Sequence, residues 1–214
     1  MSDKSAANDI NRFTRVNDAK VSPHGQQVDE NGKRIIMVNG IPASGKSALA
    51  ERLSQQAGWL KLSLDGIKNP FLQHLDGVDR AFNRTLGKAS YQVIWSIVAD
   101  APAGSTFIVD AWFGFQPREL LRDYLAQAGV TRLVEVWCQI SAERVAGRYA
   151  ARLGERLPGH PGAEYIAELR ALAERAGPMQ LGPVYSVDQD RDQPPDVGII
   201  YDWILHQLPR SKIA

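Results

Sequence analysis

The chain has 214 residues, of which 44% are hydrophobic and 23% are charged, and its formal net charge is +1. This length can bury one sizeable core, and the near-neutral charge excludes a global basic field of the kind that draws proteins to nucleic acid or to anionic membranes. The single cysteine, Cys138, lies in an apolar run, which predicts a buried side chain and excludes an intrachain disulfide. We therefore expect one soluble, cytoplasmic domain that does not enter a membrane.

Residues 1–30 are polar and mixed in charge, with Ser-Pro-His-Gly at 22–25. Their few scattered apolar side chains cannot bury enough surface to offset the entropy of folding. We expect this segment to form a mostly disordered leader, and residues 31–214 to form the functional domain.

An apolar run at 35–38 leads directly into Gly-x-x-x-x-Gly-Lys-Ser at 40–47, and a helical pattern follows. Strand, glycine-rich loop and helix in this order form a cradle in which backbone N–H groups and the helix N-terminus bind phosphate. In such a loop Lys46 neutralises phosphate oxygens and the Ser47 hydroxyl reaches Mg²⁺. The alternative is an ordinary strand-to-helix turn. The nucleotide-binding residues predicted here are Gly40, Ile41, Pro42, Ala43, Ser44, Gly45, Lys46, Ser47 and Ala48.

Beyond the loop, strand and helix patterns alternate. The predicted strands are 34–39, 59–64, 105–110, 131–138 and one near 184–188; the predicted helices are 46–57, those between 66 and 101, 117–128, segments within 141–176, and 196–208. Five strands separated by crossover helices predict an α/β fold with a five-stranded parallel sheet covered on both faces. Ligands of such sheets lie at the C-terminal ends of the strands.

Two aspartates, Asp65 and Asp110, follow predicted strands and should lie on the same edge as the phosphate loop. Asp65 could orient an acceptor hydroxyl and take its proton, or it could cap the helix that begins near Gly66. Asp110 could lie beside Mg²⁺, directly or through water, or it could start a turn or cap a helix. The sequence leaves both alternatives open.

Four arginines recur at every fourth position: Arg144, Arg148, Arg152 and Arg156. In one continuous helix they would form a stripe along one face. Because four like charges repel each other, phosphate oxygens could supply the missing negative charge, and a solvated helix face is the alternative. The Pro/Gly-rich stretch at 157–162 breaks the helix and is typical of a closing lid.

A few other side chains could contact an acceptor. Arg80 and Arg84 could reach an acidic group or could be surface charges, and Trp112, Phe113 and Phe115 could line a pocket or pack in the core. His160 could touch the acceptor or could simply be exposed.

With these motifs the chain resembles the small P-loop kinases of the chloramphenicol phosphotransferase and zeta-toxin-like group, over roughly residues 34–208. The likeness rests on the phosphate loop, Leu64-Asp65, Phe107-Ile108-Val109-Asp110, Gly147-Arg148 with Arg152 and Arg156, and Tyr185-Ser186-Val187-Asp188. It implies a P-loop NTPase fold with a kinase domain at 31–214 and a helical lid at about 144–176.

The resemblance also implies roles for single residues. Lys46 and Ser47 would bind the phosphates and Mg²⁺ of ATP, and Asp65 would be the base on the acceptor side. Arg152 and Arg156 would belong to the lid, with Arg148 as a further nucleotide contact. Asp188 and the stretch after it would border the adenine.

The function expected from the sequence is transfer of phosphate from ATP to a hydroxyl of a small molecule such as a sugar, nucleotide sugar or antibiotic. Two alternatives stay open. A 5′-hydroxyl polynucleotide kinase would need a basic channel, which a net charge of +1 does not indicate. A nucleotide-driven ATPase or switch would act through a protein partner, but the chain has no Asn-Lys-x-Asp or Thr-Lys-x-Asp guanine motif, and Ala111 rather than a glutamate follows Asp110. The sequence assigns no particular acceptor and no oligomeric state.

Overall fold

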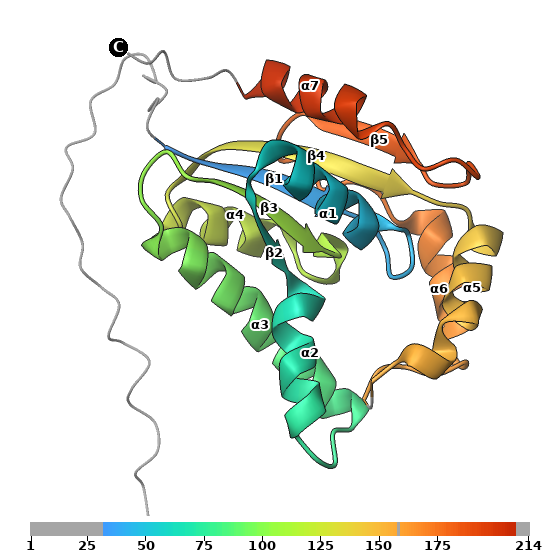
Figure 1. The fold of residues 1–214 in the computed structure, drawn as a ribbon. Coiled ribbons are helices and arrows are strands. Elements are labelled where there is room, and N and C mark those ends of the chain that lie inside the picture. The colour runs from blue at the N-terminus through green and yellow to red at the C-terminus, as the bar shows by residue number, and fades with distance from the viewer. Residues whose placement is uncertain (1–31, 158, 209–214) are drawn as a thin grey trace, which may run out of the picture.

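The computed structural model describes residues 32–157 and 159–208, so the leader expected at 1–30 lies outside the described residues. Within them, five strands form one sheet in the order β2-β3-β1-β4-β5, and every neighbouring pair is parallel. Helices flank this sheet (Figure 1). The predicted α/β class and the five-stranded parallel sheet are confirmed.

The elements follow the predicted order. The strands are β1 (Lys33–Asn39), β2 (Leu60–Ser63), β3 (Thr106–Ala111), β4 (Val130–Gln139) and β5 (Val184–Asp188). The helices are α1 (Lys46–Ala57), α2 (Leu64–His74), α3 (Arg80–Asp100), α4 (Arg118–Gln127), α5 (Ala142–Ala151), α6 (Tyr165–Arg175) and α7 (Val197–Gln207), with short 3₁₀ helices η1 (Phe113–Phe115) and η2 (Leu153–Glu155). In the described part of the chain no helix is long and apolar enough to cross a membrane.

The central strand β1 is buried on both faces, as the continuous apolar run predicts. Ile35 and Met37 belong to the core beneath α3 and α4, whereas Ile36 and Val38 belong to the core beneath α1 and α7. All four side chains are fully buried. The end of β1 is therefore held rigidly at the point where the phosphate loop begins.

A buried carboxylate reinforces this edge of the sheet. Glu135 of β4 accepts hydrogen bonds from Asn39 Nδ2 at 2.7 Å and from the backbone N–H groups of Met179 and Gln180, each at 2.9 Å. The side-chain oxygen of Asn39 accepts from Phe113 N at 3.1 Å. One network thus joins the end of β1 to the loop after β3 and to the chain that enters β5.

We expect Glu135→Ala to lower the free energy of unfolding by about 2 kcal/mol or more, because it leaves the donors of the buried residues Asn39 and Met179 unpaired at roughly 1–3 kcal/mol each. Urea unfolding measures this loss. The control is Glu119→Ala on α4, whose side chain is 77% exposed and which should change stability by less than about 0.5 kcal/mol. A loss of under about 1 kcal/mol for Glu135→Ala would contradict the structural role of the network.

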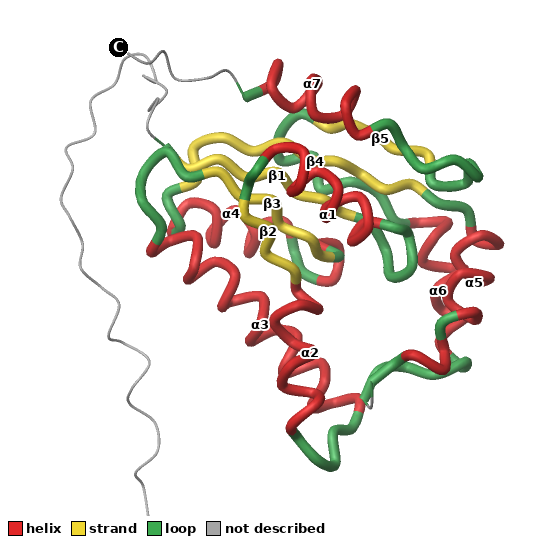
Figure 2. Tube along the Cα trace, viewed as in Figure 1, coloured by secondary structure: helices red, strands yellow, loops and turns green. Residues whose placement is uncertain are grey.

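Two segments far apart in the sequence meet beyond the sheet. The loop between η2 and α6, drawn green in Figure 2, reaches the end of the α2–α3 pair. Asn83 Nδ2 donates to Gly159 O at 2.8 Å, and His160 Nε2 lies 3.4 Å from Asn69 Oδ1. The segment predicted to be a lid therefore rests on α2 and α3.

Candidate active site

The loop between β1 and α1 has the compact geometry that its glycines allow. Gly45 has a φ of 91°, and a Cβ there would lie 2.8 Å from Gln189 Oε1. A Cβ at Gly40 would lie 2.4 Å from Ser44 Oγ. The first turn of α1 has no side-chain cap, which leaves its N–H groups free for a ligand. Lys46 and Ser47 open this turn, as the sequence predicts.

Arg148 of α5 joins the phosphate loop to the chain after β5. Its guanidinium donates to Gln189 O at 2.9 Å and to Ser44 O at 3.4 Å. Gln189 is buried, and its amide lies 3.7 Å from Cys138 Sγ. These contacts bring the stretch after Asp188 to the phosphate loop, where the sequence places the nucleotide.

Asp188 itself, at the end of β5, is half exposed. Its carboxylate accepts from Asp190 N at 2.9 Å and from Arg191 Nε at 3.2 Å. The Asp188 carboxylate therefore stabilises the turn that follows it. The contact between this segment and the phosphate loop comes from Gln189 instead.

Asp65 lies in the first turn of α2, just beyond the end of β2. Ser63 caps this helix, because its Oγ accepts from Gly66 N at 3.3 Å, so the interpretation of Asp65 as the N-cap is wrong. Desolvation by surrounding groups raises the pKa of Asp65, but the positive charges of Lys68 and Lys46 outweigh it and hold the pKa below its usual value. The structure thus brings an ionised carboxylate under the influence of the phosphate-loop lysine.

Asp110 is 2% exposed and lies within β3, paired with Val38 of β1. It caps no helix, because the strand continues to Ala111. Its Oδ2 accepts from Ser63 Oγ at 3.2 Å, and its buried Oδ1 has no hydrogen-bond partner among the described residues. An orphaned carboxylate oxygen near a phosphate loop fits a hydrated cation, since Mg²⁺ in phosphate sites uses one or two protein carboxylates and keeps several waters.

The prediction that four arginines form one continuous helical stripe is wrong. α5 ends at Ala151, Arg152 is its C-cap with a φ of −108°, and Arg156 follows η2 in an extended conformation. Gly154 lies just beyond this end, and glycine disfavours a helix interior. Arg144 pairs with Asp192 at 2.7 Å, and the Arg156 guanidinium lies 3.7 Å from the centre of the Tyr149 ring. The four side chains therefore diverge.

His160 is partly buried, so the interpretation of it as a merely exposed histidine is wrong. Burial, together with the positive charges of Lys68 and Arg156, lowers its pKa to about 4, although Asp65 opposes this shift. At neutral pH its imidazole is uncharged.

The remaining candidates divide between core and surface. Phe113 is buried and packs edge-to-face against Tyr91 at 6.1 Å, so it belongs to the core. Phe115 is 39% exposed, and Trp112 packs against Trp137 at 6.1 Å.

Arg84 is exposed, and Arg80 pairs with Glu168 at 3.3 Å on the surface. Cys138 is fully buried, as expected, and burial raises the pKa of its thiol to about 12.

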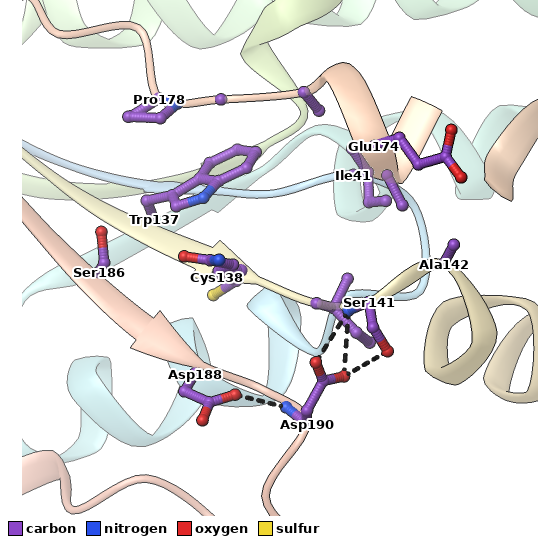
Figure 3. Close-up of a pocket in the computed structure, with 15 residues that line it drawn as sticks. Ile41, Trp137, Cys138, Ser141, Ala142, Glu174, Pro178, Ser186, Asp188 and Asp190 are labelled. Carbon is purple, nitrogen blue, oxygen red and sulfur yellow. Dashed lines mark hydrogen bonds between the residues drawn. The ribbon is translucent and has the colours of Figure 1, made fainter. Parts of the chain in front are cut away.

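A cavity of about 780 Å³ lies at the C-terminal ends of β4 and β5 (Figure 3). Trp137, Ser186 and Asp190 line it, and the Asp190 carboxylate accepts hydrogen bonds of 2.9 to 3.1 Å from the backbone N–H and hydroxyl of Ser141. Ile41 of the phosphate loop also lines it, but Lys46 and Asp65 do not. The cavity therefore neighbours the phosphate loop at Ile41.

Several polar residues of this region were not predicted from the sequence. Lys68 lies one helical turn after Asp65, a spacing that could have predicted their ion pair. Gln189 and Asn83 carried no such signal, because their contacts join segments remote in the sequence. The residues missed are Asn39, Lys68, Asn69, Asn83, Glu135 and Gln189.

A parallel sheet whose central strand β1 leads into a phosphate loop, with Asp110 near the end of β3 and Asp65 just after β2, is the fold of the small P-loop kinases. The chain belongs to the AAA domain family, whose model matches residues 35–176. No curated protein matches the chain significantly.

Several solved structures share this fold. A candidate kinase from Chloroflexus aurantiacus is 25% identical with a TM-score of 0.71, over 82% of this chain and 98% of its own. A gluconokinase from Sinorhizobium meliloti is 17% identical with a TM-score of 0.50, over 84% of this chain and 93% of its own. At this lower identity the likeness shows the fold alone.

Proposed function

We propose that the chain is an ATP-dependent phosphotransferase that moves the γ-phosphate of Mg-ATP to a hydroxyl of a small molecule such as a sugar, nucleotide sugar or antibiotic. The observation that carries this proposal is Asp65. Its ionised carboxylate lies beside the phosphate loop within the influence of Lys46, where an acceptor hydroxyl would meet the γ-phosphate. The fold shared with kinase structures supports the reaction class.

On the nucleotide side, the loop residues 40–48 would wrap the phosphates, with Lys46 against the β- and γ-phosphates. Ser47 and Asp110 would hold Mg²⁺, which supplies charge neutralisation to the phosphates when bound. Arg148 would be a further contact to the nucleotide, and the stretch after Asp188 would border the adenine.

On the acceptor side, Asp65 would orient the hydroxyl and take its proton late in the transfer. The hydroxyl oxygen forms a bond to the γ-phosphorus while the bond from that phosphorus to the β–γ bridging oxygen breaks, which releases ADP. Arg152 and Arg156 would stabilise the charge on the transferred group. We propose that these arginines act from a lid at about 144–176 within a kinase domain at 31–214.

We expect Arg152→Ala and Arg156→Ala each to lower kcat by about 10² to 10³, because a charge clamp used mainly in the transition state affects turnover more than binding. Steady-state kinetics with the acceptor measures this effect. Arg122→Ala, at an exposed site on α4, is the matched control and should stay near the wild-type value. Near wild-type kcat for both lid variants would remove them from the mechanism.

The proposal as a whole is tested by ADP release in the presence of Mg-ATP and pools of sugars, nucleotide sugars and antibiotics. Release that depends on one of these small acceptors supports it. Release that is unaffected by every pool, or that needs an added protein, contradicts it.

A further inference from the structure

Lys68 is the one lysine or arginine that is buried among the described residues, at 7% exposure. Its Nζ lies 3.1 Å from Asp65 Oδ1, but the Asp65 side chain is 54% exposed. In the described part of the chain this is its one ion pair. An ammonium group carries three donors, and burying it costs free energy unless anions or acceptors surround it. A single, half-open carboxylate satisfies it incompletely.

Positive charge exceeds negative charge around this pair. Lys46 and Lys68 both act on Asp65, and Lys68 and Arg156 both act on His160. Lys46 belongs to the phosphate loop and would be matched by the phosphates of ATP. Lys68 lies on α2, outside that loop, and it loses the charge of its ion-pair partner when Asp65 takes the proton of the acceptor, so a second anion would then match it.

The segment predicted to be a lid also lies beside the Asp65–Lys68 pair. His160 Nε2 lies 3.4 Å from the side-chain oxygen of Asn69, the residue next to Lys68, and Asn83 holds Gly159. The uncharged imidazole and the Asn69 amide are polar groups that can contact an oxygen bound at Lys68. Lys68, Asn69 and His160 thus form a small polar cluster beside Asp65.

We propose that the acceptor carries an acid group, a carboxylate or a phosphate ester, which binds Lys68 while the reactive hydroxyl binds Asp65. This inference rests on the proposed phosphotransferase function and names the substrate class of the same site. Because Asp65 and Lys68 are 3.1 Å apart, the acid and the hydroxyl belong to one short carbon skeleton. The acid of the substrate supplies Lys68 with an anion when Asp65 engages the hydroxyl proton.

Calorimetry on the full chain, saturated with a non-hydrolysable ATP analogue and Mg²⁺, tests this without requiring turnover. The probes are matched sets: ribitol, ribonate and ribitol 5-phosphate, and glycerol, glycerate and glycerol 3-phosphate. An acid form should bind about 10 to 100 times more tightly than its neutral alcohol, as a charge-assisted contact contributes. The preferred acid distinguishes a carboxylate site from a phosphate site.

Lys68→Met keeps the length of the side chain without its charge, and should bring the ratio of acid to alcohol affinity to about one. Lys68→Arg should retain part of the preference. Lys88→Met, at an exposed site on α3, is the control and should keep the wild-type ratio.

Equal binding of acid and alcohol by the wild type, or binding of no acid, overturns the proposal. So does a Lys68→Met protein that keeps the preference, or one that loses affinity for the ATP analogue, because Lys68 would then serve the nucleotide. The proposed function fails separately if the wild type binds these acids but transfers no phosphate from ATP to any probe.

Discussion

Lys46→Ala is expected to weaken the binding of Mg-ATP by about 100-fold. The substitution removes the positive charge held against the β- and γ-phosphates, and a hydrogen bond between charged groups contributes about 1.5–3 kcal/mol. Because the Lys46 side chain is partly exposed at the start of α1, the fold should survive its loss. Calorimetric titration with ATP measures the affinity, and the thermal unfolding midpoint checks the fold.

Lys88→Ala, at an exposed site on α3, is the matched control and should bind ATP as the wild type does. Wild-type affinity in Lys46→Ala would show that the phosphate loop does not bind the nucleotide in the proposed way. An equal loss of affinity in both variants would point to a general charge effect.

Asp65→Asn is expected to keep ATP affinity and to lower the transfer rate by about 10² to 10⁴, the usual contribution of a positioned general base. The amide has the size of the carboxylate but cannot accept the proton of the acceptor. Helix α2 should still form, because Ser63 and not Asp65 caps it. Single-turnover transfer and ATP titration separate the two effects.

Asp76→Asn, at an exposed position after α2, serves as the control and should transfer phosphate normally. Unchanged turnover in Asp65→Asn would rule out its role as base. A loss of ATP affinity equal to the loss of rate would instead assign Asp65 to the nucleotide.

The fold was predictable because its signals are local. The apolar runs at β1 and β3, the glycine-rich loop between β1 and α1, and the turn residues between elements each determine their own segment. The parallel sheet followed from the alternation of strands and helices. The order of the strands in the sheet could not be predicted, because it depends on which face of the sheet each crossover helix covers.

The candidate site was predictable only where its residues stand at strand ends or within the loop. Asp65 lies just after β2, and Asp110 lies near the C-terminal end of β3. The geometry of a parallel sheet therefore places both near Lys46. The divergence of the arginines was missed because spacing alone cannot show that α5 ends at Ala151. The contact of Asn83 with Gly159 joins residues 76 positions apart, and tertiary packing alone creates it.

The most direct test of the proposed phosphate transfer follows the γ-phosphate of labelled ATP. The full chain is incubated with Mg-ATP and a mixture of small polyols and their acids, beside Asp65→Asn. We expect label in a stable phosphate monoester of a small molecule with the wild type, and almost none with the variant. Label that passes only to water as inorganic phosphate, at equal rates in both proteins, would contradict it.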